Sequence, residues 1–157
     1  MELVRGGMKN PLTTEWVTSA AMGGTGTAEN ASDTMVLNMD DLPSICRIGI
    51  EVEFNINKIA GTGFPQAVPQ VSSIYLDALN TTRIYSNPGY RAWIAVYGGA
   101  TGTTKKRRFY YFPPVMQTIP NSTLGEYIET RVYAKGTAAD TQWTITGIQS
   151  RLIYIPL

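Results

Sequence analysis

The clearest pattern in the chain is a strict alternation of apolar and polar residues from Ile48 to Ile56. Its apolar positions are occupied by Ile48, Ile50, Val52, Phe54 and Ile56. Glu51 and Glu53 belong to the polar side, together with Gly49 and Asn55. Because successive side chains of a strand point to opposite faces, the alternation predicts a β-strand with one face in a core and the other toward water.

Weaker copies of this alternation recur, and no segment shows a convincing helical period. They cover Tyr90–Tyr97, Glu126–Ala134 and Gln142–Ile155, and Gly147 marks an expected β-bulge in the last of them. Glycine, proline and asparagine separate about eight or nine predicted strands, which is typical of a sandwich or barrel. We therefore predict an all-β fold, a single eight-stranded jelly roll of two packed antiparallel sheets. An immunoglobulin-like sandwich is the alternative, but its frequent Cys…Trp…Cys pattern is absent.

The 157 residues fit one domain preceded by an arm. Residues 1–12 show no periodicity and include Asn10-Pro11, so we expect an extended N-terminal arm there. Residues 13–157 form the predicted jelly-roll domain.

The composition is that of a chain with a real core and a weakly charged surface. Hydrophobic residues make up 43% of the sequence, charged residues only 16%, and the net charge is +1. So little charge is unusual for a monomer that must stay soluble by its own surface. Either much of the surface is covered in an assembly, or the chain is an ordinary β-protein, and composition does not separate the two.

Several kinds of chemistry are excluded by the absence of histidine and the presence of a single cysteine, Cys46. A Ser-His-Asp triad, an intramolecular disulfide and a zinc site built from Cys and His all need residues that the chain lacks. We expect Cys46 to be a small buried hydrophobe. We therefore predict no enzyme activity, no cofactor and no metal site. An enzyme that uses carboxylates alone is the least favoured alternative. Oxygen ligands for calcium are present, but no Asp-rich loop has the required spacing.

The most concentrated charge lies at Lys105–Arg108, directly before a run of aromatic residues. Clustered basic residues beside aromatics can bind nucleic acid or anionic lipid. The same run can instead protect an exposed strand edge from aggregation, or form salt bridges to a neighbouring subunit. Adjacent residues of a strand face opposite ways, so the four basic side chains cannot share one surface.

Exposed aromatic residues could serve either as stacking platforms for sugars or as subunit contacts, where Tyr and Trp are enriched. The sequence leaves both uses open. Together with the basic run, the candidate interface or ligand-facing residues are Trp93, Tyr97, Lys105, Lys106, Arg107, Arg108, Tyr127 and Tyr133.

Glu51 and Glu53 share one strand face and could form a carboxylate pair with a raised pKa. Two carboxylates on the outer face of a strand are more often solvated, or paired with Arg or Lys across the sheet. We interpret this side of the strand as a solvent or subunit face rather than as a catalytic site.

The strand pattern, the arm at Met1–Pro11, the low charge and the missing active-site residues resemble single-jelly-roll viral coat proteins. The chain is most similar in kind to the small major capsid protein of thermophilic, tailless icosahedral phages with an internal membrane. The resemblance implies a structural virion protein, a major capsid subunit that self-assembles with a second coat protein into an icosahedral shell. The arm has only Arg5 and Lys9 as basic residues, which fits a shell separated from nucleic acid by a membrane.

The partners implied by this resemblance are further copies of the chain, as a dimer or higher homo-oligomer, and a second capsid protein. Proximity to an internal membrane and no direct contact with nucleic acid are also implied, and the expected location is the virion capsid after assembly in the host cytoplasm. The alternative function is a carbohydrate- or receptor-binding β-sandwich module, of the spike or lectin-like kind.

Overall fold

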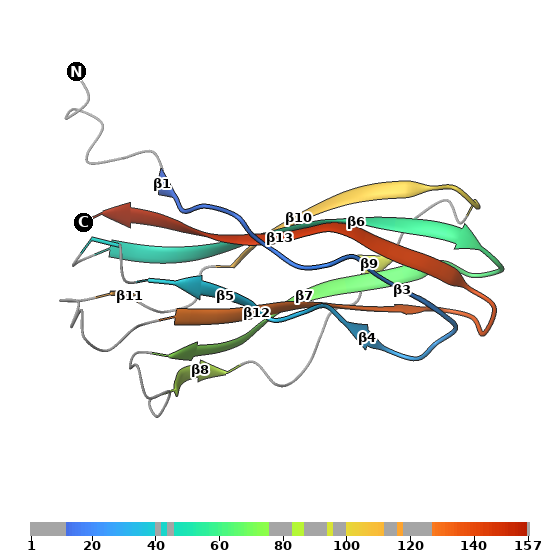
Figure 1. The fold of residues 1–157 in the computed structure, drawn as a ribbon, viewed down its shortest axis with the longest axis horizontal. Helices are drawn as coiled ribbons and strands as arrows, with labels where there is room; N and C mark the ends of the chain where they lie inside the picture. The colour runs from blue at the N-terminus through green and yellow to red at the C-terminus, as the bar shows by residue number, and fades with distance from the viewer. Residues whose placement is uncertain are drawn as a thin grey trace, which may run out of the picture.

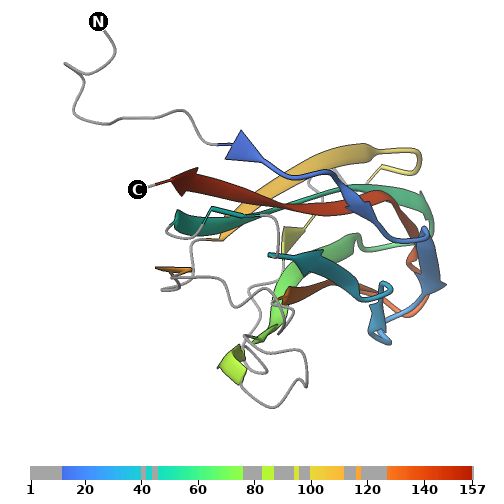
Figure 2. The ribbon, with the colours of Figure 1, turned by 60° about the vertical axis from the view of Figure 1, so that its left-hand side comes forward.

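The computed structural model describes residues 12–39, 42–43, 46–75, 83–86, 94–95, 100–111, 116–117 and 127–156. Within these ranges the chain contains β-strands and no helix. The strands form two antiparallel sheets that lie face to face (Figure 1 and Figure 2). This confirms the predicted all-β sandwich.

The first sheet is built around two long central strands, β6 (Cys46–Ala60) and β13 (Gln142–Pro156), which pair with each other. Its remaining strands are β1 (Leu12–Thr13), β2 (Val17–Thr18), β3 (Met22–Thr25), β10 (Thr104–Tyr111) and β11 (Met116–Gln117). Strands β1, β2 and β3 follow one another along the outer edge of β13, and β10 and β11 pair with the other edge of β6. Leu12, assigned to the arm from the sequence, thus takes part in a strand.

The second sheet is centred on β7 (Pro65–Tyr75) and β12 (Tyr127–Gly136). The strands at its margins are β4 (Asn30–Ala31), β5 (Met35–Asn38), β8 (Arg83–Ser86) and β9 (Ile94–Ala95). β4 and β5 pair with β12, whereas β8 and β9 pair with β7.

The order of the strands is that of a jelly roll. Several short strands pair one after another with the same long strand, and each such group can be counted as one strand position. Counted in this way, the described part of each sheet has four strand positions. They are β1–β3, β13, β6 and β10–β11 in the first sheet, and β4–β5, β12, β7 and β8–β9 in the second. The chain passes from one sheet to the other after each position except between β7 and β8, so both sheets are completed by strands distant in sequence.

The core lies between the sheets and follows the predicted alternation of β6. Every apolar side chain that the sequence pattern assigned to the core side of Ile48–Ile56 is fully buried. Cys46 is buried as well. Across the strand pair, the rings of Phe54 and Phe109 stack with their centroids 5.7 Å apart. The second sheet contributes Ile128 and Val132 from the inner face of β12.

The expected bulge at Gly147 is confirmed. The pairing of β13 with β6 shifts register between Thr146 and Gln149, and Gly147 has a φ of 59°. A Cβ atom there would lie 2.8 Å from Nδ2 of Asn55, so both the backbone conformation and the close neighbour favour glycine.

The substitution Phe54→Ala is expected to lower the free energy of unfolding by about 3–5 kcal/mol, because it removes a buried ring and leaves a cavity in the core. Urea denaturation at low protein concentration measures this loss. The matched control is Ile59→Ala on the same strand, where the side chain is 45% exposed and the expected loss is below about 1 kcal/mol. Equal losses at both positions would contradict the assignment of the core face.

Candidate functional site

The outer face of the first sheet carries a row of charged side chains that its strand register brings together. Glu51 and Glu53 lie on the central strand β6. Arg108 of β10 is opposite Glu53, while Gln149 and Arg151 of β13 are opposite Glu53 and Glu51. Directly opposed residues of neighbouring strands share a face and lie about 4.5–5.5 Å apart at their Cβ atoms. The register alone therefore places one arginine opposite each carboxylate, Arg108 opposite Glu53 and Arg151 opposite Glu51. We call Glu51, Glu53, Lys106, Arg108 and Arg151 the charged ladder.

Arg108 links the two carboxylates of the charged ladder. Its Nη2 atom lies 2.9 Å from Oε2 of Glu53, and its Nε donates to the same oxygen at 3.0 Å. The Nε atom also lies 3.4 Å from Oε1 of Glu51. Glu51 has a second cation in Arg151, at 2.8 Å, and Glu53 has one in Lys106, at 3.3 Å. Each carboxylate is thus engaged by two basic side chains of the same molecule.

Both carboxylates are buried although they face outward. Glu51 is 2% and Glu53 6% exposed, because the side chains of the neighbouring strands cover them. The interpretation as a solvent face was wrong in this respect, and cross-strand pairing, the other alternative from the sequence, is what the structure shows. Their charges are therefore largely used within the chain rather than offered to a partner.

The pKa of Glu53 lies below its ordinary value. Burial by itself raises this pKa, but the hydrogen bonds donated by Gln149, Arg108 and Lys106, with the charge of Lys106, outweigh it. In return, the hydrogen bond to Glu53 raises the pKa of Arg108, as does Tyr110 to a smaller extent. A general acid must carry a proton near neutral pH and therefore needs a raised carboxyl pKa. The lowered pKa of Glu53 favours the deprotonated carboxylate, which is the wrong state for that role.

The end of the charged ladder is covered by Trp16, which lies between β1 and β2. The guanidinium carbon of Arg151 lies 4.1 Å from the centroid of the Trp16 ring. A guanidinium over an aromatic face is attracted by the ring's quadrupole. The N-terminal strands are thereby tied to the same network that joins β6, β10 and β13.

The basic run Lys105–Arg108 does not form one patch. Lys106 and Arg108 belong to the charged ladder, whereas Lys105 and Arg107 are paired with Ile56 and Phe54 and lie on the opposite side of β10. Among the described residues, the buried Nε atom of Arg107 has no hydrogen-bond partner.

The two aromatic candidates within the described residues are not brought together with the basic run. Tyr127 and Tyr133 are half-buried on the outer face of β12, in the second sheet, and so lie on the far side of the sandwich from the charged ladder. Trp93 and Tyr97 lie outside the described residues. The described members of the candidate set are therefore divided between the two sheets.

Neither a metal-binding cluster nor a membrane-spanning helix is present in the described ranges. No group of three or more His, Cys, Asp or Glu side chains in them is arranged to hold a metal ion. These ranges also contain no helix with the length and hydrophobicity needed to cross a bilayer.

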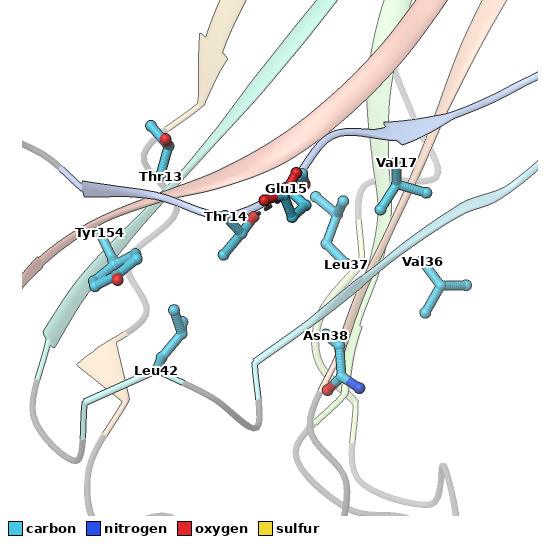
Figure 3. A pocket seen from close by; sticks show the side chains of 9 residues that line it. All are labelled: Thr13, Thr14, Glu15, Val17, Val36, Leu37, Asn38, Leu42 and Tyr154. Atoms are coloured by element: carbon cyan, nitrogen blue, oxygen red, sulfur yellow. Dashed lines mark hydrogen bonds between the residues drawn. The ribbon is translucent and has the colours of Figure 1, made fainter.

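A second surface feature, which sequence reasoning missed, is a groove of about 430 Å³ between the edge strands of the two sheets (Figure 3). Its floor includes Leu37 and Leu42, which are buried, and its walls include Val17 and Tyr154, which are half-buried. Glu15 is its charged lining residue. We call it the edge groove. Its one signal in the sequence is the short apolar stretch Met35–Met39, which contains Leu37 but does not indicate which strands meet there.

Comparison with known proteins found no matching family model and no matching curated protein. Among solved structures, a chain of the T13 viral particle of infectious bursal disease virus aligns over 94% of this chain and 32% of its own length, with 11% identity and a TM-score of 0.50. The VP2 subviral particle of the same virus aligns over 93% of this chain and 33% of its own, with 14% identity and a TM-score of 0.46. This chain thus spans about a third of the viral chains that it matches.

A bacterial structure is also similar, the CBM22-1 xylan-binding domain of Xyn10C from Paenibacillus barcinonensis. It aligns over 95% of this chain and 98% of its own length, with 12% identity and a TM-score of 0.41. At such identities the likeness to both kinds of protein concerns the fold alone.

The substitution Glu53→Gln is expected to lower the free energy of unfolding at pH 7 by about 1–3 kcal/mol, because it removes a charge-assisted hydrogen-bond acceptor. A carboxyl whose folded pKa is lowered stabilises the fold above its unfolded pKa, roughly 4.3, and loses that contribution as pH falls through the folded pKa. The difference between wild type and variant should therefore shrink toward pH 3.

Urea denaturation at pH 7, 5, 4 and 3 measures this difference. Asp33→Asn, at an exposed carboxylate, is the control for general effects of lost negative charge. A difference that stays the same at every pH would show that the Glu53 charge does not stabilise the fold.

Proposed function

We propose that this chain is a structural virion protein, a jelly-roll capsid subunit whose function is to assemble with further copies of itself. The observation that carries the proposal is the complete jelly-roll strand order. Jelly rolls occur in viral capsids and in lectin-like domains. The fold neighbour with a TM-score of 0.50 is a chain of a viral particle, which supports the first of these uses.

The two edges of the first sheet differ in a way that supports assembly. Exposed strand edges in monomeric proteins are commonly protected by charged side chains, since an unprotected edge pairs with other chains. Strand β10 has this protection in Lys105–Arg108. On the opposite side, none of the strands β1, β2, β3, β4 and β5 contains a charged residue. Exposed Glu15, Glu29 and Asp33 lie in the connections, but the strands of this side carry no charge and are therefore suited to contact another subunit.

Exposed apolar side chains mark the same side of the molecule. Leu12 of β1 is 48% exposed and Val36 of β5 is 47% exposed, and Val36 lines the edge groove. Contacts between permanently associated subunits are more apolar than the rest of a protein surface. Covering these residues in an assembly would remove them from water.

The finer parts of the proposal rest on the resemblance to phage coat proteins. They are a second coat protein as partner, an icosahedral shell near an internal membrane, assembly in the host cytoplasm, and no direct contact with nucleic acid. We further propose that the chain is not an enzyme. The arrangement of Glu51 and Glu53, each engaged by two cations, supports this because neither is available as a general acid or base.

The full-length chain is expected to form dimers or larger species at high concentration, as measured by light scattering and native mass spectrometry. Deleting residues 1–10 should weaken this association more than it changes the free energy of unfolding, if the arm is an interface element. A full-length chain that stays strictly monomeric would count against a capsid function.

The alternative function in carbohydrate binding stays a prediction, because Trp93 and Tyr97 lie outside the described residues. A glycan array distinguishes it from assembly. Specific binding that is lost in Trp93→Ala or Tyr97→Ala would favour a lectin-like module, whereas the capsid proposal expects no specific signal.

A further inference from the structure

The edge groove is bounded by backbone as well as by side chains. Along one wall the chain runs from β1 through Thr14 to β2, anchored to β13 by the hydrogen bond from Thr14 N to Leu152 O at 3.0 Å. The facing rim is β5, which pairs with β12. Among the described strands, none pairs with the other edge of β5. The groove therefore combines a lining of apolar and polar side chains with a strand edge that can accept a further strand.

The side chains of β5 alternate in a way that fits an added strand. Met35 and Leu37 are buried, while Val36 between them is 47% exposed at the rim. The groove volume of about 430 Å³ lies within the range, roughly 300–1,000 Å³, of clefts that receive ligands. Side chains of an extended peptide could enter it while the peptide backbone pairs with β5.

We propose that the edge groove receives the N-terminal segment, residues 1–11, of a second copy of this chain. This inference rests on the proposed assembly function and names the contact that drives it. The segment, which reads MELVRGGMKNP, supplies the apolar residues Leu3, Val4 and Met8 for the groove. It also carries Arg5 and Lys9, whose positive charges complement Glu15 in the groove lining.

The length and starting point of the segment fit this site. Residues 1–11 precede Leu12 directly, and fully extended they would reach roughly 36–40 Å. An added strand along the four residues of β5 needs only about 13 Å of that length. Enough chain remains to cross from the domain of one copy to the groove of another.

The direction in which the chain leaves the groove favours the N-terminal segment of a second copy, rather than that of the same molecule, as the occupant. Leu12–Thr13 already lies at one end of the groove, and the following residues line its wall, so residues before Leu12 start from the groove's end. Proline at position 11 has no N–H and biases Asn10 toward extended conformations, which opposes a reversal there. A reversal at Gly6-Gly7 would leave only residues 1–5 to fill the groove.

The first test compares two arginine variants of the full-length chain. Val36→Arg places a charge on the groove rim that repels Arg5 and Lys9, and it is expected to raise the dissociation constant of the dimer at least tenfold in sedimentation equilibrium. Ile59→Arg, at a side chain of matched exposure outside the groove lining, should leave that constant within twofold. Urea denaturation of both variants checks that they remain folded.

The second test identifies the segment and the copy to which it belongs. Full-length Leu3→Cys is mixed with full-length Val36→Cys under mild oxidation, and we expect a disulfide-linked dimer containing one chain of each kind. The native Cys46 is fully buried and should not compete. A mixture of Leu3→Cys with Ile59→Cys is the matched control and should give no such dimer.

The possible outcomes separate this inference from the function on which it rests. Two results together would overturn the groove contact and leave assembly intact. The Val36→Arg variant would have the same dissociation constant as the wild type, and no disulfide would form between Leu3→Cys and Val36→Cys. A double variant, Leu3→Cys with Val36→Cys, that closes only an intramolecular disulfide would show that the segment returns to its own groove, which overturns the exchange between copies. A full-length chain that is monomeric at every concentration would overturn both the exchange and the proposed function.

Discussion

The first sheet depends on the neutralisation of two carboxylates that its central strand carries on the outer face. Glu51 and Glu53 are almost fully buried. Burying an ion without a partner costs several kcal/mol, so β6 forms a stable sheet only when cations arrive from both neighbours. Arg108 comes from β10 and Arg151 from β13, strands that lie far from β6 in the sequence. The charged ladder thus links three strands that are far apart in the sequence and must be brought together by the fold.

The same requirement selects one strand register. A shift of one residue would turn the core side chains of β6 outward and its carboxylates inward, and would also move Arg108 away from Glu53. The hydrophobic side and the charged side of β6 therefore specify the same alignment. Because a buried carboxylate that loses its cation is an uncompensated buried charge, we infer that the burial of Glu51 and Glu53 penalises other registers and makes the ladder specific.

The sequence predicts the parts of this arrangement that are local. The alternation from Ile48 to Ile56 gave the strand and its core face, and the glycine at position 147 gave the bulge, because both signals lie within one segment. The partners of Glu51 and Glu53 could not be predicted, since that requires the order and register of strands up to 100 residues apart. Alternation did show that Lys105–Arg108 could not form one patch, but not that two of its members would be used internally. The edge groove could not be predicted for a similar reason, because it is formed by residues 13–17, 36–38, 42 and 154, which lie far apart in the sequence.

A jelly roll supports both capsid assembly and sugar binding, so the fold alone does not give the function. The function has to be argued from surfaces with unprotected strand edges or exposed apolar side chains. The outer face of the first sheet is not one of them, because its charges pair with one another and its cation at Arg151 stacks on Trp16. The edge at β10 is protected by its basic residues. Two surfaces are left in the described chain. One is the outer face of the second sheet, with Tyr127 and Tyr133. The other is the side formed by β1–β5, which has uncharged strands, exposed Leu12 and Val36, and a groove. A strand edge beside apolar side chains can be paired by an extended segment of another polypeptide, because main-chain hydrogen bonds and side-chain pockets then act together.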